Sequence, residues 1–237
     1  MSRWQSPLLV TLALTACSLA AEPAKDQWLV FRGNPSETGV LPADALSDNL
    51  EVLWRFSAKD AIDGAAAIAD GVVFIGSEDE HLYAVDLATG AKKWEYKCGP
   101  IKAAPAYRDG AVYVGDSNGL FHCVDAKTGK KRWTFPTGAE ITSGANFAGD
   151  AVLFGSYDET LYCVDNNGKE VWKFKTQGPV NGSPAVAGDR TFVAGCDSAL
   201  HVIDVKSGKE LTSVDLGAQA AATAAVVGDQ LYVGTMG

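Results

Sequence analysis

Short apolar runs alternate with polar turns from about residue 60 to residue 235, and no stretch in this region keeps a helical period. Asp-Gly or Gly-Asp dipeptides separate many of the runs, as at Asp109-Gly110. These dipeptides are strong hairpin signals, because glycine accepts a positive φ without a Cβ clash. The pattern predicts short antiparallel strands and excludes a helical solenoid. In one representative unit the expected strands are 103–107, 111–115, 120–124 and 132–135.

The four-strand pattern repeats about every 40 residues. Its best-preserved part is an Asp-x-x-(Thr/Asn/Ser)-Gly-x-x-x-Trp phrase, and its fourth copy has Thr212 in place of the tryptophan. A repeat of this length predicts a stacked or radial array, in which no single unit can bury its own apolar faces. The positions of the phrase are Asp86, Gly90, Trp94, Asp125, Gly129, Trp133, Asp165, Gly168, Trp172, Asp204 and Gly208.

Side-chain size changes in a regular way across each unit. The first expected strand is built of small residues, as in Ala103-Ala104-Pro105-Ala106, and the last carries Trp and Phe. Small residues suit an axis where sheets converge, and large ones suit a rim where they diverge. Four antiparallel strands per unit and this size gradient predict an all-β fold, a β-propeller of four-stranded blades with the first strands innermost.

The repeated phrase resembles the tryptophan-docking motif of the pyrroloquinoline-quinone (PQQ) type β-propeller repeat family, which has BamB-like and quinoprotein-like members. The resemblance covers about residues 50–237, and the segment 28–35 also resembles the start of many secreted bacterial members. Trp-Asp repeat propellers fit less well, because Glu95, Thr134 and Lys173 follow the tryptophans. Kelch repeats are longer, near 50 residues. The resemblance implies that each tryptophan packs against the next blade.

The family implies eight blades, whereas the sequence supplies one last strand (53–56), four blades and two strands of a fifth. We expect an open arc of about four and a half blades, whose bare faces exceed the ~300–600 Å² apolar patch of a soluble monomer. An N-terminal part of a longer chain is therefore expected, and a head-to-tail oligomer is the rarer alternative. The expected regions are a lead-in 22–50 and a propeller 51–237, with blades at about 61–98, 99–137, 138–176, 177–216 and a partial blade 217–237.

The first residues have the form of an export signal. Arg3 precedes an apolar segment, 7–16, which is shorter than the ~20 residues that span a bilayer. Two cleavage sites remain open. A lipoprotein signal of residues 1–16 would make Cys17 the lipidated first residue, and a signal peptide of residues 1–21 would release a soluble protein. Both predict export to the periplasm or cell envelope, and only the first predicts an outer-membrane lipid anchor.

The charge balance argues against nucleic acid as a partner. Without residues 1–16 the chain keeps 19 Lys and Arg against 29 Asp and Glu. Phosphate recognition needs clustered cations. The basic runs 92–93 and 130–132 fall in turns of different units and are expected to be solvated.

The repeated aspartates and the cysteines favour structural roles. An Asp followed by a turn that ends in Gly is expected to cap the turn with its carboxylate. Four cysteines lie in the propeller region, without a Cys-x-x-Cys or Cys/His cluster, so neither a zinc site nor another metal is expected. Cys123 and Cys163 occupy equivalent positions in neighbouring units, beyond the ~7 Å limit between Cα atoms for a disulfide. His122 and His201 are expected in strands, and His81 in a solvated turn.

The units disagree most at the residue just before the small first strand. A polar residue of changing type stands there, after an apolar one. This placement predicts one mouth of the central channel, where a ligand site is one interpretation and ordinary polar strand entries are the other. The candidate residues are Asp63, Lys102, Thr142 and Asn181.

Two functions from different classes follow. The favoured one is a non-catalytic, exported interaction platform, similar to the outer-membrane assembly propeller lipoprotein, with an envelope protein or glycan as partner, no cofactor and no catalytic residue. The alternative is a PQQ-dependent dehydrogenase, which the resemblance implies would hold the quinone with calcium in the channel. The sequence has no adjacent cysteines and no haem-attachment motif, and its 39–40 residue interval leaves little room for loops over a quinone.

Overall fold

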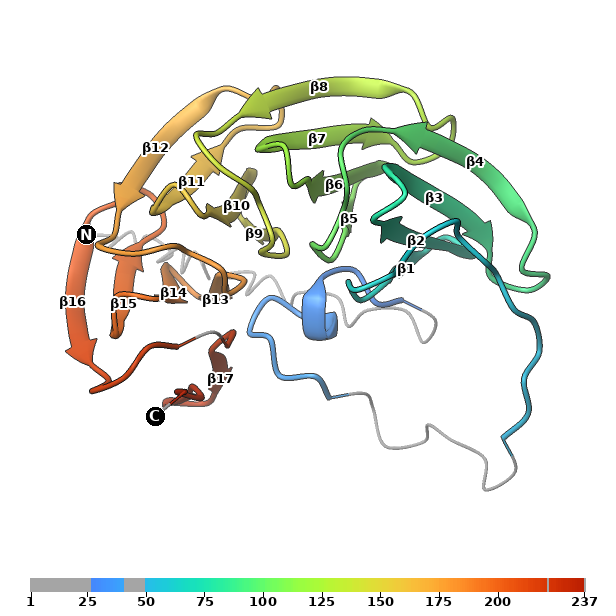
Figure 1. The fold of residues 1–237 in the computed structure, drawn as a ribbon. Helices are drawn as coiled ribbons and strands as arrows, with labels where there is room; N and C mark the ends of the chain where they lie inside the picture. The colour runs from blue at the N-terminus through green and yellow to red at the C-terminus, as the bar shows by residue number, and fades with distance from the viewer. Residues whose placement is uncertain (1–26, 41–49, 221, 237) are drawn as a thin grey trace, which may run out of the picture.

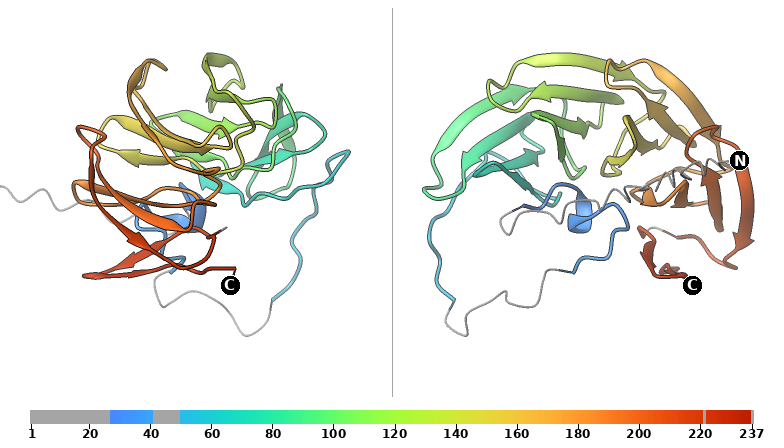
Figure 2. Two further views of the ribbon diagram at one scale, coloured as in Figure 1. Left: turned by 60° about the vertical axis from the view of Figure 1, so that its left-hand side comes forward. Right: turned by 180° about the vertical axis from the view of Figure 1, so that it is seen from behind.

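The computed structural model describes residues 27–40, 50–220 and 222–236. Its strands form four four-stranded antiparallel sheets and one two-stranded sheet, and within each sheet every strand pairs with the next along the chain. Figure 1 shows the sheets side by side in an arc, and the views of Figure 2 agree. The blades are β1 (Ala67–Ala69), β2 (Val72–Ser77), β3 (His81–Asp86) and β4 (Lys92–Lys97); β5 (Ala106–Arg108), β6 (Ala111–Gly115), β7 (Leu120–Asp125) and β8 (Lys131–Pro136); β9 (Asn146–Ala148), β10 (Ala151–Ser156), β11 (Thr160–Val164) and β12 (Glu170–Lys175); β13 (Ala185–Ala187), β14 (Arg190–Ala194), β15 (Ala199–Asp204) and β16 (Glu210–Asp215); and β17 (Ala225–Val227) with β18 (Gln230–Tyr232).

The architecture is the predicted one, an all-β propeller whose arc does not close within the described residues. The first strand of each blade faces the hub, and β4, β8, β12 and β16 form the rim (Figure 1). The small side chains of the inner strands allow this convergence, since Ala67, Ala69 and Ala106 are fully buried. No helix among the described residues has the length and apolar character needed to cross a membrane.

The structure corrects two expected strands. The first strand of blade 2 begins at Ala106 rather than at residue 103, and Pro105 just before it has no N–H to donate to a ladder. Residues 53–56 form no strand, because a strand needs a hydrogen-bonded neighbour and this segment has none among the described residues. Trp54 is nevertheless fixed, since its Nε1 donates to the Leu87 carbonyl over 2.9 Å.

The apolar core lies between the blades rather than within one of them. The rings of Phe121 on β7 and Phe154 on β10 stack with centroids 3.8 Å apart, and both residues are fully buried. The same buried cluster contains Tyr113 from blade 2 and Val164 from blade 3. Each blade therefore completes the core of its neighbour, as the repeat length predicts.

The lead-in, residues 27–40, occupies the hub. It contains the short 3₁₀ turn η1 (Phe31–Gly33), which lies at the centre of the arc in Figure 1. Its polar backbone groups bind the inner strands of all five blades, so the lead-in ties them together along the axis. The bonds are Trp28 with Ile68 in both directions (2.8 Å), Tyr107 N–H to Leu29 O (2.7 Å), Asn146 Nδ2 to Pro35 O (2.8 Å), Val186 N–H to Pro35 O (2.7 Å) and Val226 N–H to Ser36 O (2.9 Å).

Glu37 is the fully buried acid of this lead-in. Its Oε1 lies 3.3 Å from Nδ2 of Asn146, and its Oε2 has no hydrogen-bond partner among the described residues. Burial raises the pKa of Glu37 to about 9, although Arg32 acts in the opposite direction. The carboxyl group is therefore neutral at pH 7 and can remain in the hub without a counter-ion.

Candidate functional site

The rim tryptophans join each blade to the next one. Trp94 Nε1 donates to the carbonyl of Ala126 over 2.9 Å, and the indole covers Gly129 of the following blade. Gly129 has φ +69°, and a Cβ there would come within 2.8 Å of the indole. Glycine is thus required both for the turn and for the close approach. The same arrangement holds for Trp133 with Asn166 O (2.8 Å) and Gly168, and for Trp172 with Val205 O (2.8 Å) and Gly208.

The repeated aspartates cap the turns that carry these glycines. Asp125 Oδ1 accepts hydrogen bonds from the Thr128 N–H (2.9 Å) and hydroxyl (2.7 Å). The hydrogen bond from Arg132 and those from Thr128 lower the pKa of Asp125 to about 2. Because the Asp125 carboxylate accepts bonds from both Thr128 and Arg132, it anchors the turn, and a structural role is favoured over an acid–base role. Asp86, Asp165 and Asp204 accept the corresponding bonds from Thr89, from the N–H groups of Asn167 and Lys169, and from Ser207.

A second repeated contact was missed in the sequence. In each blade an aspartate after the second strand bonds the central residue of the third strand, which is Tyr in blades 1 and 3 and His in blades 2 and 4. An aromatic ring from the preceding rim segment then packs on that residue. In three of the four blades the aspartate stands four residues before the Tyr or His, and this spacing in the sequence could have predicted the contact. The triads are Phe56–Tyr83–Asp79, Tyr96–His122–Asp116, Phe135–Tyr162–Asp158 and Phe174–His201–Asp197, with bonds to the aspartate of 2.7 to 2.8 Å.

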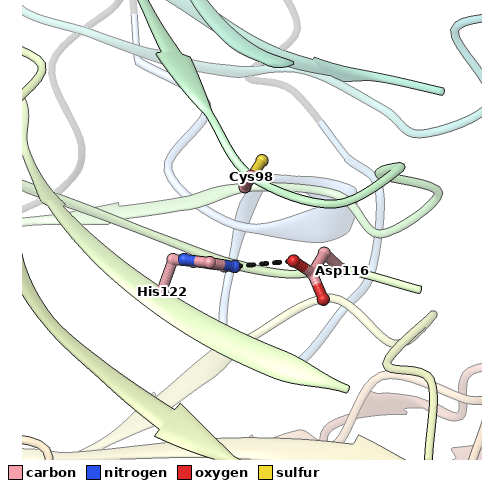
Figure 3. Close-up of side chains that lie close together, drawn as sticks. All are labelled: Cys98, Asp116 and His122. Atoms are coloured by element: carbon pink, nitrogen blue, oxygen red, sulfur yellow. Dashed lines mark hydrogen bonds and ion pairs between the residues drawn. The ribbon is translucent and has the colours of Figure 1, made fainter. Parts of the chain in front are cut away.

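His81 and Cys98 also depart from the sequence interpretation. His81 is the first residue of β3 rather than part of a solvated turn, and its ring stacks on Tyr83. Cys98 lies beside Asp116 and His122, and their ligand atoms fall within 4.8 Å of one another, so a Cys/Asp/His cluster does exist in space (Figure 3).

The hydrogen bonds of this cluster favour a structural role. Asp116 accepts bonds from His122 Nε2 and from the N–H groups of Gly99, Asn118 and Leu120. Burial opposes ionisation of Asp116, yet the bonds from His122 and these N–H groups outweigh it and lower its pKa. Burial raises the pKa of Cys98 to about 12, so the thiol is protonated in the protein without a bound metal. The cluster is the blade 2 copy of the repeated triad with a neutral thiol beside it.

The four channel-mouth candidates come together at the hub. Asp63, Lys102, Thr142 and Asn181 line one pocket of about 370 Å³, although they belong to four different blades. Asp63 and Lys102 are exposed, and Thr142 and Asn181 are half-buried. Phe31 and Arg32 of the lead-in also line this pocket, together with Ser183 and Thr223. The hub mouth is therefore a polar cavity with wall residues from the blades and a lead-in residue of positive charge.

The hub mouth contains both hydrogen-bond donors and acceptors. The Asn181 side-chain oxygen is buried and has no hydrogen-bond partner among the described residues. Asn181 Nδ2 lies 3.7 Å from Cys196 Sγ, which orients the amide. Beside the pocket, the neighbouring Asp63 carboxylate raises the pKa of Glu78. The site can both donate and accept hydrogen bonds.

The described residues of the hub mouth fit calcium poorly. Calcium in proteins takes six to eight oxygen ligands, several of them carboxylates. Among the described lining residues, Asp63 supplies the one carboxylate, and Arg32 and Lys102 bring two positive charges close to it. We therefore derive no chemistry from a quinone–calcium pair at these residues. The lipidation candidate Cys17 lies outside the described residues.

The docked tryptophans, capped turns and hub-facing small strands define a β-propeller of the tryptophan-docking, PQQ-like repeat class. The family model described as outer membrane protein assembly factor BamB matches residues 44–142 and 117–237. Together these matches cover most of the chain, and the chain belongs to this family.

Individual relatives agree with this assignment. The outer membrane protein assembly factor BamB of Alteromonas naphthalenivorans is 37% identical over 67 residues, which are 28% of this chain and 16% of that protein. The structure of BamB from Moraxella catarrhalis gives a TM-score of 0.67 at 22% identity and covers 76% of this chain and 57% of that one. A europium-containing methanol dehydrogenase gives 0.71 at 17% identity, over 81% and 49%. The chain thus spans little more than half of the BamB structure, and these structural likenesses show the fold.

Proposed function

We propose that this protein is a non-catalytic interaction platform of the bacterial cell envelope that binds an envelope protein or glycan at the hub mouth. The observation that carries the proposal is the contrast between the rim, whose contacts repeat from blade to blade, and the hub mouth, whose side chains differ. The rim repeats one set of contacts at the three junctions between the four complete blades, whereas the hub mouth gathers Asp63, Lys102, Thr142 and Asn181 in one pocket. Family membership supports an envelope location and a role beside outer-membrane assembly proteins.

A rigid scaffold suits such a platform. The lead-in ties the inner strands to the hub, and the tryptophans tie the rim, so polar groups from four blades keep fixed positions. Preorganised groups lose little conformational entropy on binding. The acidic chain makes a basic or neutral partner more favourable than an anionic polymer.

The test is site-specific photo-crosslinking of the full-length protein in its native envelope. A crosslinking residue at position 102 is expected to capture a defined partner, and the same residue at position 206, in an exposed rim turn of blade 4, is expected to capture none. Lys102→Ala combined with Asn181→Ala should abolish co-purification of that partner while the melting temperature stays unchanged. Equal capture at both positions would contradict a hub-mouth site.

A cofactor assay distinguishes the proposed platform from the alternative function, a PQQ-dependent dehydrogenase. The full-length protein is mixed with PQQ and Ca²⁺, and quinone absorbance and dye reduction with alcohols or sugars are recorded. The proposal expects no stoichiometric quinone binding and no dye reduction. Tight, stoichiometric binding would replace the platform with a quinoprotein dehydrogenase.

A further inference from the structure

Cys98 occupies a register position where the next two blades carry threonine. It lies four residues after the rim tryptophan of blade 1, just past β4, and Thr137 and Thr176 lie at the same place after β8 and β12. In all three blades the backbone N–H of this residue donates to a carbonyl in the turn before the third strand, over 2.8 to 3.0 Å. The backbone therefore repeats at this position, whereas the side chain of blade 1 differs from the other two.

The two threonines use their hydroxyl groups to hold the local backbone. Oγ1 of Thr137 bonds two carbonyl oxygens at 2.9 and 2.7 Å, and Oγ1 of Thr176 bonds the corresponding two at 2.9 and 2.7 Å. Sγ of Cys98 lies 3.9 Å from the carbonyl oxygens of Glu80 and Tyr96, and a thiol is a weak donor. The hydrogen bonds of this loop therefore do not explain why blade 1 has a cysteine here.

The side chains beside Cys98 are the Asp116 carboxylate and the His122 imidazole of blade 2 (Figure 3). The thiol, carboxylate and imidazole place their ligand atoms within 4.8 Å of one another. Blade 4 repeats the bond between aspartate and histidine, but it has Thr176 at the register position of the cysteine. The difference at one repeated position thus adds a sulfur ligand to an acid and a histidine that are already paired.

The three ligand atoms are close to the spacing that a zinc ion requires. Zinc in proteins is tetrahedral with bonds of about 2.0–2.3 Å, which places neighbouring ligand atoms about 3.3–3.8 Å apart. His122 Nε2 and Asp116 Oδ2 lie 2.8 Å apart, and Sγ of Cys98 completes a group in which no separation exceeds 4.8 Å. Side-chain movements of about 1 Å are enough to bring all three atoms to one ion.

Contacts around the cluster hold two of the ligands in place. Asp116 Oδ2 also accepts the Gly99 N–H over 2.8 Å, and two N–H groups of its own turn bond Oδ1 at 2.9 and 3.0 Å. Nδ1 of His122 lies 3.1 Å from the hydroxyl oxygen of Tyr96. Histidines that bind metals commonly form a hydrogen bond through the ring nitrogen that is not coordinated. All of these bonds can persist when an ion binds, because only the bond between His122 and Asp116 must be given up.

We propose that Cys98, Asp116 and His122 bind a zinc ion that joins blade 1 to blade 2. The ion takes the place of the hydrogen between His122 Nε2 and Asp116 Oδ2, the thiol releases its proton to water, and the histidine carries its own proton on Nδ1, facing Tyr96. The thiolate and the carboxylate together balance the charge of Zn²⁺. Sulfur, nitrogen and oxygen ligands suit zinc, and water fills the fourth position beside the half-buried cysteine. None of the three ligands lines the hub-mouth pocket.

The test is a titration of the reduced, metal-free full-length protein with Co²⁺, which replaces zinc and has a visible spectrum. We expect a thiolate-to-cobalt charge-transfer band in the near ultraviolet and the intense visible bands of a tetrahedral ion. Both should saturate, and Zn²⁺ should then remove them by displacing the cobalt. A titration without the charge-transfer band, or with the weak bands of an octahedral ion alone, overturns the proposal.

Two cysteine variants provide a matched pair. Cys98→Thr introduces the residue that the next two blades have at this position, and it should abolish the charge-transfer band and weaken zinc binding about a hundredfold or more. Cys196→Thr changes another half-buried cysteine, outside the cluster, and should leave the band unchanged and the dissociation constant for zinc within twofold. A band that persists in Cys98→Thr, or that both variants lose equally, overturns the site.

The connection between the blades has a separate readout. Zn²⁺ should raise the melting temperature of the parent and leave that of Cys98→Thr unchanged, because an ion that binds the folded state stabilises it. His122→Tyr introduces the residue of blades 1 and 3, removes the imidazole ligand, and takes the place of Cys98→Thr in both measurements if the threonine variant does not fold. Equal stabilisation of the parent and the variant by Zn²⁺ contradicts the assigned ligands.

Discussion

The rim and the hub of this propeller are built by opposite rules. At the rim the same three contacts recur at each complete junction: an indole on a glycine, a capped turn, and an aspartate-bonded Tyr or His under an aromatic ring. At the hub mouth the positions are equivalent but the side chains are an acid, a base, a hydroxyl and an amide. Repetition therefore marks the residues that hold blades together, and variation marks the residues left free for chemistry. Each prediction below removes one side of this contrast between the rim and the hub.

The largest expected effect is the loss of a rim indole. Trp172 is 9% exposed and bonds the Val205 carbonyl of the next blade. Trp172→Ala should lower the free energy of unfolding by ~3–5 kcal/mol, because a large buried ring is replaced by a cavity. Urea denaturation of the full-length protein measures it. Val171→Ala on the same strand, where the side chain is 53% exposed, is the control and should cost little.

The next largest effect on stability comes from Glu37 in the lead-in, and it depends on pH. The folded-state pKa of Glu37 is raised to about 9 from an ordinary 4.5, so its contribution is fully present below pH 4.5 and is lost as pH rises toward 9. Glu37→Gln is neutral at every pH and should be more stable than the parent by about 3 kcal/mol at pH 7. The two proteins should converge near pH 4.5.

Melting temperatures between pH 4.5 and pH 9 measure this difference. Glu51→Gln, at an exposed position, is the control and should follow the parent at each pH. A constant difference between Glu37→Gln and the parent across the range would show that Glu37 is charged in the folded hub, contrary to its burial.

A pair of glycines tests the fit of the indole more finely. Gly208 and Gly188 both have positive φ, at +68° and +61°. A Cβ on Gly208 would lie 2.5 Å from the Trp172 ring, whereas one on Gly188 would meet nothing within 4 Å. Gly208→Ala should therefore cost about 1–3 kcal/mol more than Gly188→Ala in urea denaturation. Equal costs would mean that the backbone conformation alone requires glycine.

The hub mouth should show the smallest effect on stability. Lys102 is exposed at the pocket and makes no ion pair with the described residues. Lys102→Ala should change the free energy of unfolding by less than about 0.5 kcal/mol. A loss comparable with that of Trp172→Ala would place this residue among the structural contacts instead.

The sequence was sufficient for the parts of the fold that repeat. The register of Trp94, Trp133 and Trp172 predicted the blades, because each unit must bury its faces against the next. The gathering of Asp63 and Asn181 at the hub also followed from equivalent positions in a radial array. Because the blades surround one axis, residues at equivalent positions of the repeat lie close together at the hub.

The rest depended on contacts that occur once. Glu37 lies in the lead-in, which occurs once in the chain, so the repeated pattern does not predict that its carboxyl group is buried. The strand predicted at 53–56 failed because pairing needs a neighbour that local propensity does not supply. Cys98 lies beside His122 only because two neighbouring blades approach each other, which no pattern within one unit shows.

Hydrogen exchange of the indole N–H groups in the full-length protein tests the join between blades most directly. The account predicts slow exchange, by NMR, for the Nε1–H of Trp94, Trp133 and Trp172, since each is bonded to a carbonyl of the following blade. Exchange of these three groups at the rate of free tryptophan would mean that the indoles face water and that the blades are held by something else.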